Sequence, residues 1–362
     1  MNINIDLFCQ STAEHLTQIF TGFNLLARHK FINLRLYKDQ NFKAGERGKP
    51  ILRATINNSY KLVFDTYDGN TLFQEDLDWC DIYFKRSFDK IEIAKRLLTT
   101  KVFPLGFNYS VYADTDNLSM QKLFWNVDQG ISIENLTPFI RSNFIFSSLL
   151  KTSSGKFTSR VSCFENFPNV IGTPLILFTA RLWEPSGRKD KLDRIEINRM
   201  RIDCIRLLKK HFEGQFVGGL YPSPEAISRY PDIVLKMGDV KKLNYLKHLK
   251  KSQICIATRG LLGSNGWKVA EYIAGAKAIV SEPLMYDVPG QFSPEQNYLE
   301  FNSPQECIER VQLLVDDTEL RYKLMHNNYE YYHAYLRPDI LVWNTLQLTL
   351  LRRLDLVNNN VP

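Results

Sequence analysis

The chain has 362 residues, which exceeds one ordinary hydrophobic core and fits two domains. Its 44% hydrophobic and 23% charged residues are typical of a globular protein and exclude an intrinsically disordered one. The net charge of +7 arises from 46 basic and 39 acidic residues spread along the chain. Because nucleic-acid binders concentrate their basic residues in a patch or stripe, no nucleic-acid partner is expected.

Cysteine usage and the N-terminal sequence indicate a reducing compartment. The six cysteines are far apart, form no CxxC pair and lie among apolar neighbours, as buried free thiols do. The start, MNINIDLF, lacks the basic region and apolar run of a signal peptide, and no stretch approaches the roughly 18 apolar residues of a membrane span. We expect a cytoplasmic protein.

In the first hundred residues, predicted strands alternate with predicted helices. The strands are 2–8, 32–37, 61–68 and 80–88, and the helices are 15–27 and 90–98. This alternation predicts a parallel sheet, in which ligands gather at the carboxyl ends of the strands. Four charged residues fall at such ends: Asp65, Asp68, Lys85 and Arg86.

A loosely patterned segment, 109–169, follows, and a second alternation begins with the apolar strand TPLILFTARLW at 173–183. Further strands are predicted at 215–220, 253–258, 277–282 and 297–301, with helices between and after them. The predicted fold class is α/β, with two Rossmann-like domains whose parallel sheets face a cleft. The expected boundaries are 1–172 and 173–335, and a last helix, 336–357, is expected to return to the first domain.

The stretch GLLGSNGWKVAEYIAGAKAIVSEPL places a glycine-rich loop directly before a short helix. Gly263 and Gly266 permit tight turns, and the helix N-terminus favours an anion such as diphosphate. Lys268 lies in the first turn, where a cation opposes the helix dipole unless an anion is near. Glu271 shares its face. The two residues are therefore either part of an anion site or a pair on the solvent face worth a few tenths of a kcal/mol.

The lysine-rich segment KKLNYLKHLKKS places leucines at 243, 246 and 249 on one face of a predicted helix. This pattern is typical of an amphipathic helix that covers a sheet. A peripheral contact with a membrane surface or an anionic partner is the alternative.

The segment WKVAEYIAGAKAIVSE, followed by NYLEF and by a helix ending in DDTELR, resembles the donor-binding half of GT-B glycosyltransferases. The strand ending in TARLW is similar to the first strand of that half. The resemblance covers about residues 174–328 and implies a donor site for a nucleotide-diphosphate sugar.

Carried over residue by residue, the resemblance implies that Glu271 hydrogen-bonds the nucleotide ribose and that Arg181 contacts the diphosphate. The glycine loop and Lys268 complete the implied donor site. Retaining members of one branch carry a further glutamate where this chain has Gly263, so the resemblance does not choose between retention and inversion. It implies catalysis without a metal or other cofactor, the departing diphosphate being stabilised by cations and a helix N-terminus.

Asp65 and Asp68, in FDTYDG, are the candidate catalytic residues. A carboxylate at a strand end can act as a general base for an acceptor hydroxyl, and the alternative is a pair of turn and capping aspartates before Gly69. The two D-x-D pairs, at 76–78 and 114–116, do not suggest a metal site, and neither GxGxxG nor a Walker loop occurs.

The predicted function is that of a metal-independent, hexosyltransferase-like enzyme that moves a sugar from a nucleotide-diphosphate sugar to a glycan, lipid-linked or protein acceptor. Synthesis of cell-surface polysaccharide or glycoconjugate, on the cytoplasmic face of a membrane, fits this activity. The alternatives are a nucleotide-sugar epimerase of the same fold and a non-catalytic GT-B module that binds a partner.

Overall fold

The structure is a computed structural model that describes residues 3–11, 13–43, 49–114 and 159–358. Most of the loosely patterned segment 109–169, including one aspartate of the second D-x-D pair, lies outside the described residues. The chain divides into two compact units. The first domain comprises Met1–Cys163, Asp287–Pro289 and Ala334–Pro362, and the second domain comprises Phe164–Tyr286 and Gly290–His333.

The first domain is built on a six-stranded sheet of order β2-β1-β3-β4-β5-β6. Strands β1 and β2 are parallel, and so are β4, β5 and β6, whereas β3 runs antiparallel to both β1 and β4. The strands are β1 (Ile3–Ser11), β2 (Ile32–Lys43), β3 (Ile51–Ile56), β4 (Tyr60–Asp65), β5 (Ile82–Lys85) and β6 (Val102–Pro104). The helical segments are η1 (Glu14–Leu16), α1 (Thr17–Arg28), α2 (Gln74–Trp79) and α3 (Lys90–Lys95).

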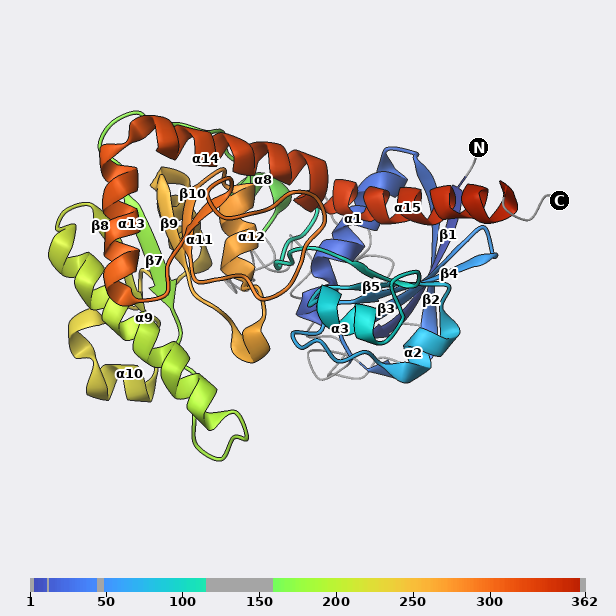
Figure 1. Cartoon of the computed structure of the whole chain (residues 1–362), viewed down its shortest axis with the longest axis horizontal. Helices are drawn as coiled ribbons and strands as arrows, with labels where there is room; N and C mark the ends of the chain where they lie inside the picture. The colour runs from blue at the N-terminus through green and yellow to red at the C-terminus, as the bar shows by residue number, and fades with distance from the viewer. Residues whose placement is uncertain (1–2, 12, 44–48, 115–158, 359–362) are drawn as a thin grey trace, which may run out of the picture. The chain divides into compact units, whose positions relative to one another are not determined.

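The last helix, α15 (Pro338–Asn358), packs on α1 of the first domain (Figure 1). Leu341, Val342 and Leu346 join the hydrophobic core beside the sheet. Gly22 of α1 permits the close approach, because a Cβ there would lie 2.1 Å from the carbonyl oxygen of Pro338. Gly inside a helix costs about 1 kcal/mol relative to Ala, which this helix–helix contact offsets.

The second domain holds a five-stranded, all-parallel sheet of order β11-β10-β9-β7-β8. The strands are β7 (Ile176–Ala180), β8 (Phe216–Leu220), β9 (Ile254–Ala257), β10 (Ala278–Ser281) and β11 (Tyr298–Glu300). Four of the five predicted strands begin and end within two residues of these bounds, and β7 is the core of the fifth. All four residues of β9 and of β10 are buried, as expected for parallel strands covered on both faces.

Helices cover both faces of this sheet (Figure 1). The helices of the second domain are α9 (Lys191–His211), α10 (Pro224–Arg229), α11 (Lys242–Lys251), α12 (Trp267–Ala274), α13 (Pro304–Asp316) and α14 (Thr318–Tyr331), with the short segments η2 (Pro231–Ile233) and η3 (Leu261–Gly263). Two further segments, α8 (Val161–Phe164) and η4 (Tyr332–Leu336), lie at the points where the chain passes from one domain to the other. In the sheet, β8 lies on one side of β7, and β9, β10 and β11 follow one another on the other side. Right-handed crossovers therefore place α9 on one face and α11 and α12 on the opposite face.

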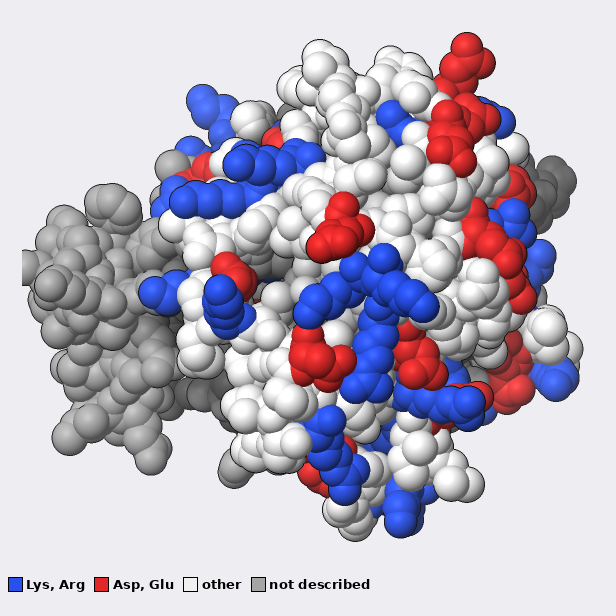
Figure 2. Space-filling view, turned by 90° about the vertical axis from the view of Figure 1, so that its left-hand side faces the viewer, with Lys and Arg blue, Asp and Glu red and all other residues white. Residues whose placement is uncertain are grey.

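The expected fold class is confirmed: two Rossmann-like α/β domains, with a last helix that packs on the first. Within the described ranges, no helix is long and apolar enough to span a membrane. On the face of the molecule in Figure 2, the Lys and Arg side chains of described residues lie among Asp and Glu side chains.

Candidate functional site

The strand order of the second domain fixes where a ligand site is expected. The order reverses between β7 and β9, so helices leave these two neighbouring strands towards opposite faces. Such a switch point opens a crevice at the carboxyl ends of the strands, where ligands of doubly wound sheets bind. The residues that follow the strands at this edge are Arg181, Tyr221, Thr258, Arg259, Glu282 and Phe301.

Arg201 of α9 ties the two strands of the switch point together, and sequence reasoning missed it. Its guanidinium donates to the carbonyl oxygen of Arg181 at 2.7 Å, to that of Arg259 at 3.1 Å and to the Thr258 hydroxyl at 3.0 Å. The side chain is buried, and burial lowers its pKa to about 10. A buried guanidinium that binds neutral groups holds positive charge behind this edge of the sheet.

The glycine loop after β9 has the tight geometry that its sequence predicts. Leu262 and Gly263 both have positive φ, 58° and 68°, and Gly266 is the N-cap residue of α12. A Cβ on Gly263 would lie 3.3 Å from Cγ of Met285. No side chain of the described chain caps α12, and an N-terminus of this kind favours an anion.

Glu271, in the second turn of α12, is the buried centre of a charged cluster, here called the Glu271 cluster (Lys242, Tyr245, Lys268 and Glu271). One carboxylate oxygen accepts a hydrogen bond from Nζ of Lys242 at 2.7 Å, and the other accepts one from the Tyr245 hydroxyl at 2.5 Å. Nζ of Lys268 lies 3.3 Å from the second oxygen and 3.4 Å from the centre of the Tyr245 ring. The glutamate is only 4% exposed, so it is not a pair on the solvent face.

The surroundings keep the Glu271 carboxylate ionised. Burial alone would raise its pKa, but the charges of Lys242 and Lys268 and the two hydrogen bonds outweigh burial and lower the pKa to about 2. Burial, and then the Glu271 charge, raise the pKa of Tyr245 well above its ordinary value, so its hydroxyl remains a donor. With two lysines and one carboxylate, the Glu271 cluster carries one net positive charge (2 − 1).

Sequence reasoning found half of the Glu271 cluster. It placed Lys268 and Glu271 on one face of a helix, which the structure confirms at three residues of separation. Lys242 and Tyr245 belong to α11, and Lys242 lies 29 residues from Glu271 in the chain. Their spacing of three on the lysine-rich helix was visible, but only the packing of α11 beside α12 shows what they contact.

Arg181, the third predicted cation, is exposed at the end of β7, and its guanidinium lies over the Tyr221 ring, 5.5 Å from the ring centre. Tyr221 is also among the groups that raise the pKa of Tyr245, after burial and the Glu271 charge. Tyr221 is thus near both Arg181 and Tyr245. The structure brings Arg181, Lys268 and Glu271 to the same edge of one sheet.

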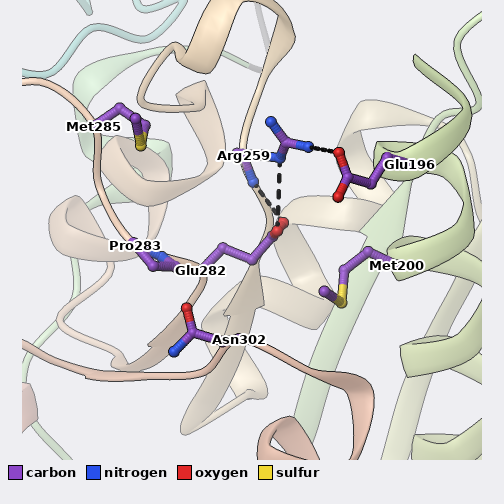
Figure 3. Close-up of a pocket in the computed structure, with 7 residues that line it drawn as sticks. All are labelled: Glu196, Met200, Arg259, Glu282, Pro283, Met285 and Asn302. Atoms are coloured by element: carbon purple, nitrogen blue, oxygen red, sulfur yellow. Dashed lines mark hydrogen bonds and ion pairs between the residues drawn. The ribbon is translucent and has the colours of Figure 1, made fainter. Parts of the chain in front are cut away.

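A pocket of about 340 Å³ opens on the α9 side of this edge (Figure 3). Arg259 is at its centre: Nη1 binds Asp193 at 2.8 Å, Nη2 binds Glu196 at 2.7 Å, and the backbone N–H donates to Glu282 at 2.9 Å. Burial raises the pKa of Glu282. Met200, Pro283, Met285 and Asn302 complete the lining.

In the first domain, the four charged residues predicted at strand ends form two pairs. The Asp65 carboxylate, at the end of β4, accepts hydrogen bonds from Nζ of Lys85 at 2.8 Å and from the Tyr83 hydroxyl at 2.6 Å. Asp65 is 0% exposed and Lys85 is 1% exposed. Asp65 therefore faces no solvent, and it fixes the ends of β4 and β5 to each other.

Asp68 is more accessible, since its side chain is 37% exposed while it pairs with the buried Arg86. His15, in η1, lies close enough to Asp68 and Arg86 for both charges to affect its pKa. Burial lowers the pKa of His15, the Asp68 charge opposes that effect, and the Arg86 charge adds to it. Of the two predicted catalytic aspartates, Asp68 is the one that an acceptor hydroxyl could reach.

The part of the chain that the structure describes has no group of three or more His, Cys, Asp and Glu residues arranged to hold a metal ion. Arg259 stands where three carboxylates converge, those of Asp193, Glu196 and Glu282. A guanidinium there neutralises carboxylates that would otherwise repel one another.

No family model matches the sequence, and no curated protein does. Solved structures of the GT-B class are similar at low identity. The C-terminal domain of the glycosyl transferase group 1 family protein LpcC from Francisella tularensis is 15% identical and superposes with a TM-score of 0.33 over 48% of this chain and 96% of its own. Sucrose-phosphate synthase from Thermosynechococcus elongatus is 13% identical, with a TM-score of 0.34 over 77% and 74% of the two chains.

The UDP-GlcNAc 2-epimerase from Neisseria meningitidis, solved with UDP-GlcNAc, is 14% identical, with a TM-score of 0.36 over 94% of this chain and 98% of its own. The three structures thus include both transferases and an epimerase. At such identities and scores they assign no residue role and no substrate to this chain.

Proposed function

We propose that this protein is a glycosyltransferase whose second domain binds a nucleotide-diphosphate sugar at the carboxyl edge of its sheet. The observation that carries the proposal is the net positive Glu271 cluster directly behind an uncapped helix N-terminus. Positive charge and backbone donors at one edge of a parallel sheet form an attractive site for a diphosphate. The acceptor would be a glycan, lipid-linked or protein substrate of surface polysaccharide or glycoconjugate synthesis.

The Glu271 cluster allows Lys268 to change partners. Lys242 and Tyr245 each hold one oxygen of Glu271, so the carboxylate stays paired when Lys268 turns towards a phosphate. Lys268 and Arg181 would then stabilise the negative charge that grows on the departing diphosphate. Since these groups are cations of the chain itself, the proposal requires no metal. Asp68 is the proposed general base for the acceptor hydroxyl.

A nucleotide-sugar epimerase would bind the same class of ligand at the same edge, and a binding module would hold it without reaction. The three differ in their products. A transferase releases nucleoside diphosphate in proportion to the glycosylated acceptor, an epimerase converts the donor to its epimer without acceptor, and a binding module does neither. Proton NMR of the donor over time, with and without an acceptor panel, separates them.

Binding itself is tested by calorimetry and thermal unfolding with UDP, GDP, ADP, CDP and dTDP, each in the presence of EDTA. We expect one of them to raise the melting temperature in proportion to the logarithm of its concentration above Kd. Arg181→Ala should weaken that binding about tenfold or more. Lys247→Ala, an exposed lysine of α11, is the matched control and should bind as the unmodified protein does. Binding that requires added divalent metal would contradict the proposed site.

A further inference from the structure

The pocket around Arg259, described above, lies beside the glycine loop of the proposed donor site. Met285 lines the pocket and is the residue that a Cβ on Gly263 would touch, at 3.3 Å. The hydroxyl of Tyr286 binds the carbonyl oxygen of Leu262 at 2.7 Å, which holds this wall of the pocket against the loop. A group attached to a diphosphate on the loop could therefore extend into the pocket.

The charge of Arg259 is countered by the carboxylates around it. Nη1 binds Asp193, Nη2 binds Glu196, and Nε lies 3.8 Å from Glu282. Counting the buried Arg201 as well, two cations face three carboxylates, a net charge of −1 (2 − 3). A ligand carboxylate entering here would meet a net negative charge.

Glu282 offers an acceptor that the protein itself does not use. It is 7% exposed, and one oxygen accepts the backbone N–H of Arg259 at 2.9 Å. Its other oxygen, Oε1, forms an ion pair with Nε of Arg259 at 3.8 Å, which is too long for a hydrogen bond. Glu282 lines the pocket (Figure 3). A carboxylate oxygen that receives no hydrogen bond from the protein can accept one from a ligand hydroxyl or amine.

The remaining lining suits a ring with polar edges and apolar faces. Met200, Pro283 and Met285 present apolar surface, and Asn302 presents an amide that both donates and accepts. A pyranose has this character, since its C–H groups form apolar faces and its hydroxyls project from the edge.

We infer that this pocket binds the sugar of the donor and selects a neutral, hydroxyl-rich or amine-bearing ring over a sugar that carries a carboxylate. The inference rests on the proposed function and adds the class of sugar to it. Glu282 would accept a sugar hydroxyl or amine, and Glu196 would repel a uronic acid. Hydrogen-bond acceptors of the protein, and not its cations, would recognise the sugar in this pocket.

The test compares two donors that differ only at C6, by calorimetry in EDTA. The uridine pair is UDP-glucose and UDP-glucuronic acid, and the guanosine pair is GDP-mannose and GDP-mannuronic acid. The affinities of UDP and GDP are measured as controls. We expect the neutral donor to bind at least tenfold more tightly than its uronic acid. Glu282→Gln should reduce that ratio to less than threefold while nucleoside diphosphate binding changes less than twofold.

Glu196→Gln is the second variant, because its side chain is 74% exposed and the change should not disturb folding. Glu196→Gln should also lower the ratio of the affinities for the neutral donor and its uronic acid. Glu309→Gln, on the exposed surface of α13, should leave that ratio unchanged. Equal binding of both donors, with the nucleoside diphosphates bound normally, would overturn the inference and leave the proposed function standing. Failure of every nucleoside diphosphate and donor to bind would overturn both.

Discussion

Nζ of Lys268 lies 3.3 Å from the carboxylate of Glu271, one turn further along α12. The helix dipole disfavours a lysine in a first turn, and this glutamate supplies the compensating negative charge. The anion that the lysine requires is therefore already present in the protein. A bound diphosphate would compete with Glu271 for Lys268, and Lys242 and Tyr245 would keep the glutamate paired.

The first prediction concerns this competition. Lys268→Ala should destabilise the protein by about 1–2 kcal/mol, because it removes one of two cations from a buried carboxylate. The dipole acting alone would give the opposite sign, a slight stabilisation. Urea unfolding at pH 7 measures the difference, with Lys247→Ala as the exposed control. A variant as stable as the unmodified protein would show that the lysine contributes nothing to holding Glu271.

The second prediction uses the depressed pKa of Glu271. A carboxylate whose pKa is about 2 when folded, against an ordinary value of 4.5, stabilises the fold above pH 4.5 and loses that contribution as the pH falls towards 2. Glu271→Gln leaves two partly buried lysines without a carboxylate and should be less stable at pH 7 by about 3 kcal/mol. The deficit should shrink steadily between pH 4.5 and pH 2. Urea titrations of both proteins across this range check it, and a deficit that is the same at every pH would count against an ionised Glu271.

The Glu271→Gln variant also tests the ribose contact that the resemblance implies. If the carboxylate accepts ribose hydroxyls, the variant should bind a nucleoside diphosphate sugar about tenfold more weakly, since charged hydrogen bonds are worth about 1.5–3 kcal/mol. Calorimetry should be done at a temperature where the variant is fully folded, as shown by its circular dichroism. Unchanged affinity in a folded variant would assign Glu271 a structural role alone.

The two aspartates of the first domain should behave differently. Asp65→Asn removes the partner of the buried Lys85 and should cost about 3–5 kcal/mol, whereas Asp68→Asn, at a 37% exposed side chain, should cost much less. If Asp68 is the base, its variant should lose turnover about a hundredfold or more with donor affinity retained.

A rescue experiment completes this contrast. Asp65→Asn combined with Lys85→Met removes both buried charges and should recover part of the lost stability. Thermal unfolding of the single and double variants measures the recovery. A double variant that is less stable than Asp65→Asn would show that Lys85 stabilises the fold independently of this pair.

Much of the fold could be predicted from the sequence, because its elements are periodic and locally encoded. The apolar runs that become β7, β9 and β10 are buried on both faces of a parallel sheet, and such runs are visible in one dimension. The Ser303 hydroxyl accepts a hydrogen bond from the backbone N–H of Glu306, which is the contact that a serine three residues before a glutamate predicts at a helix start. Strand β3, with the sequence ILRATI, is missing from the predicted elements, although the sequence carries a signal for it. Asn57 and Asn58 both have positive φ in the turn that joins β3 to β4, and asparagines between two apolar runs are typical of a hairpin.

The site was only partly predictable, because its contacts join distant parts of the chain. The charged strand ends Asp65 and Lys85 could be expected to meet, since parallel strands end at one edge. No local pattern indicates that Arg201, in the middle of α9, binds the ends of β7 and β9, or that Arg259 collects three carboxylates. These contacts depend on helix packing, which the sequence does not display.

The last prediction concerns Lys277, a buried lysine just before β10. It is 1% exposed, and its Nζ donates to the carbonyl oxygen of Lys250 at 3.2 Å. Burial lowers its pKa to about 8 from the ordinary 10.5, so between these values the unfolded chain binds more protons than the folded one. The stability that Lys277 contributes is therefore present above pH 10.5 and is lost as the pH falls through 8.

Lys277→Met should be more stable than the unmodified protein at pH 7, and this advantage should shrink by about 1–3 kcal/mol by pH 10.5. Other groups that titrate in this range do so in both proteins, so the difference between their urea unfolding free energies isolates Lys277. For Lys247→Met, at an exposed position, the difference in unfolding free energy from the unmodified protein should not change with pH over the same range. A flat difference for Lys277→Met as well would mean that the lysine remains charged and solvated through a local opening of the chain.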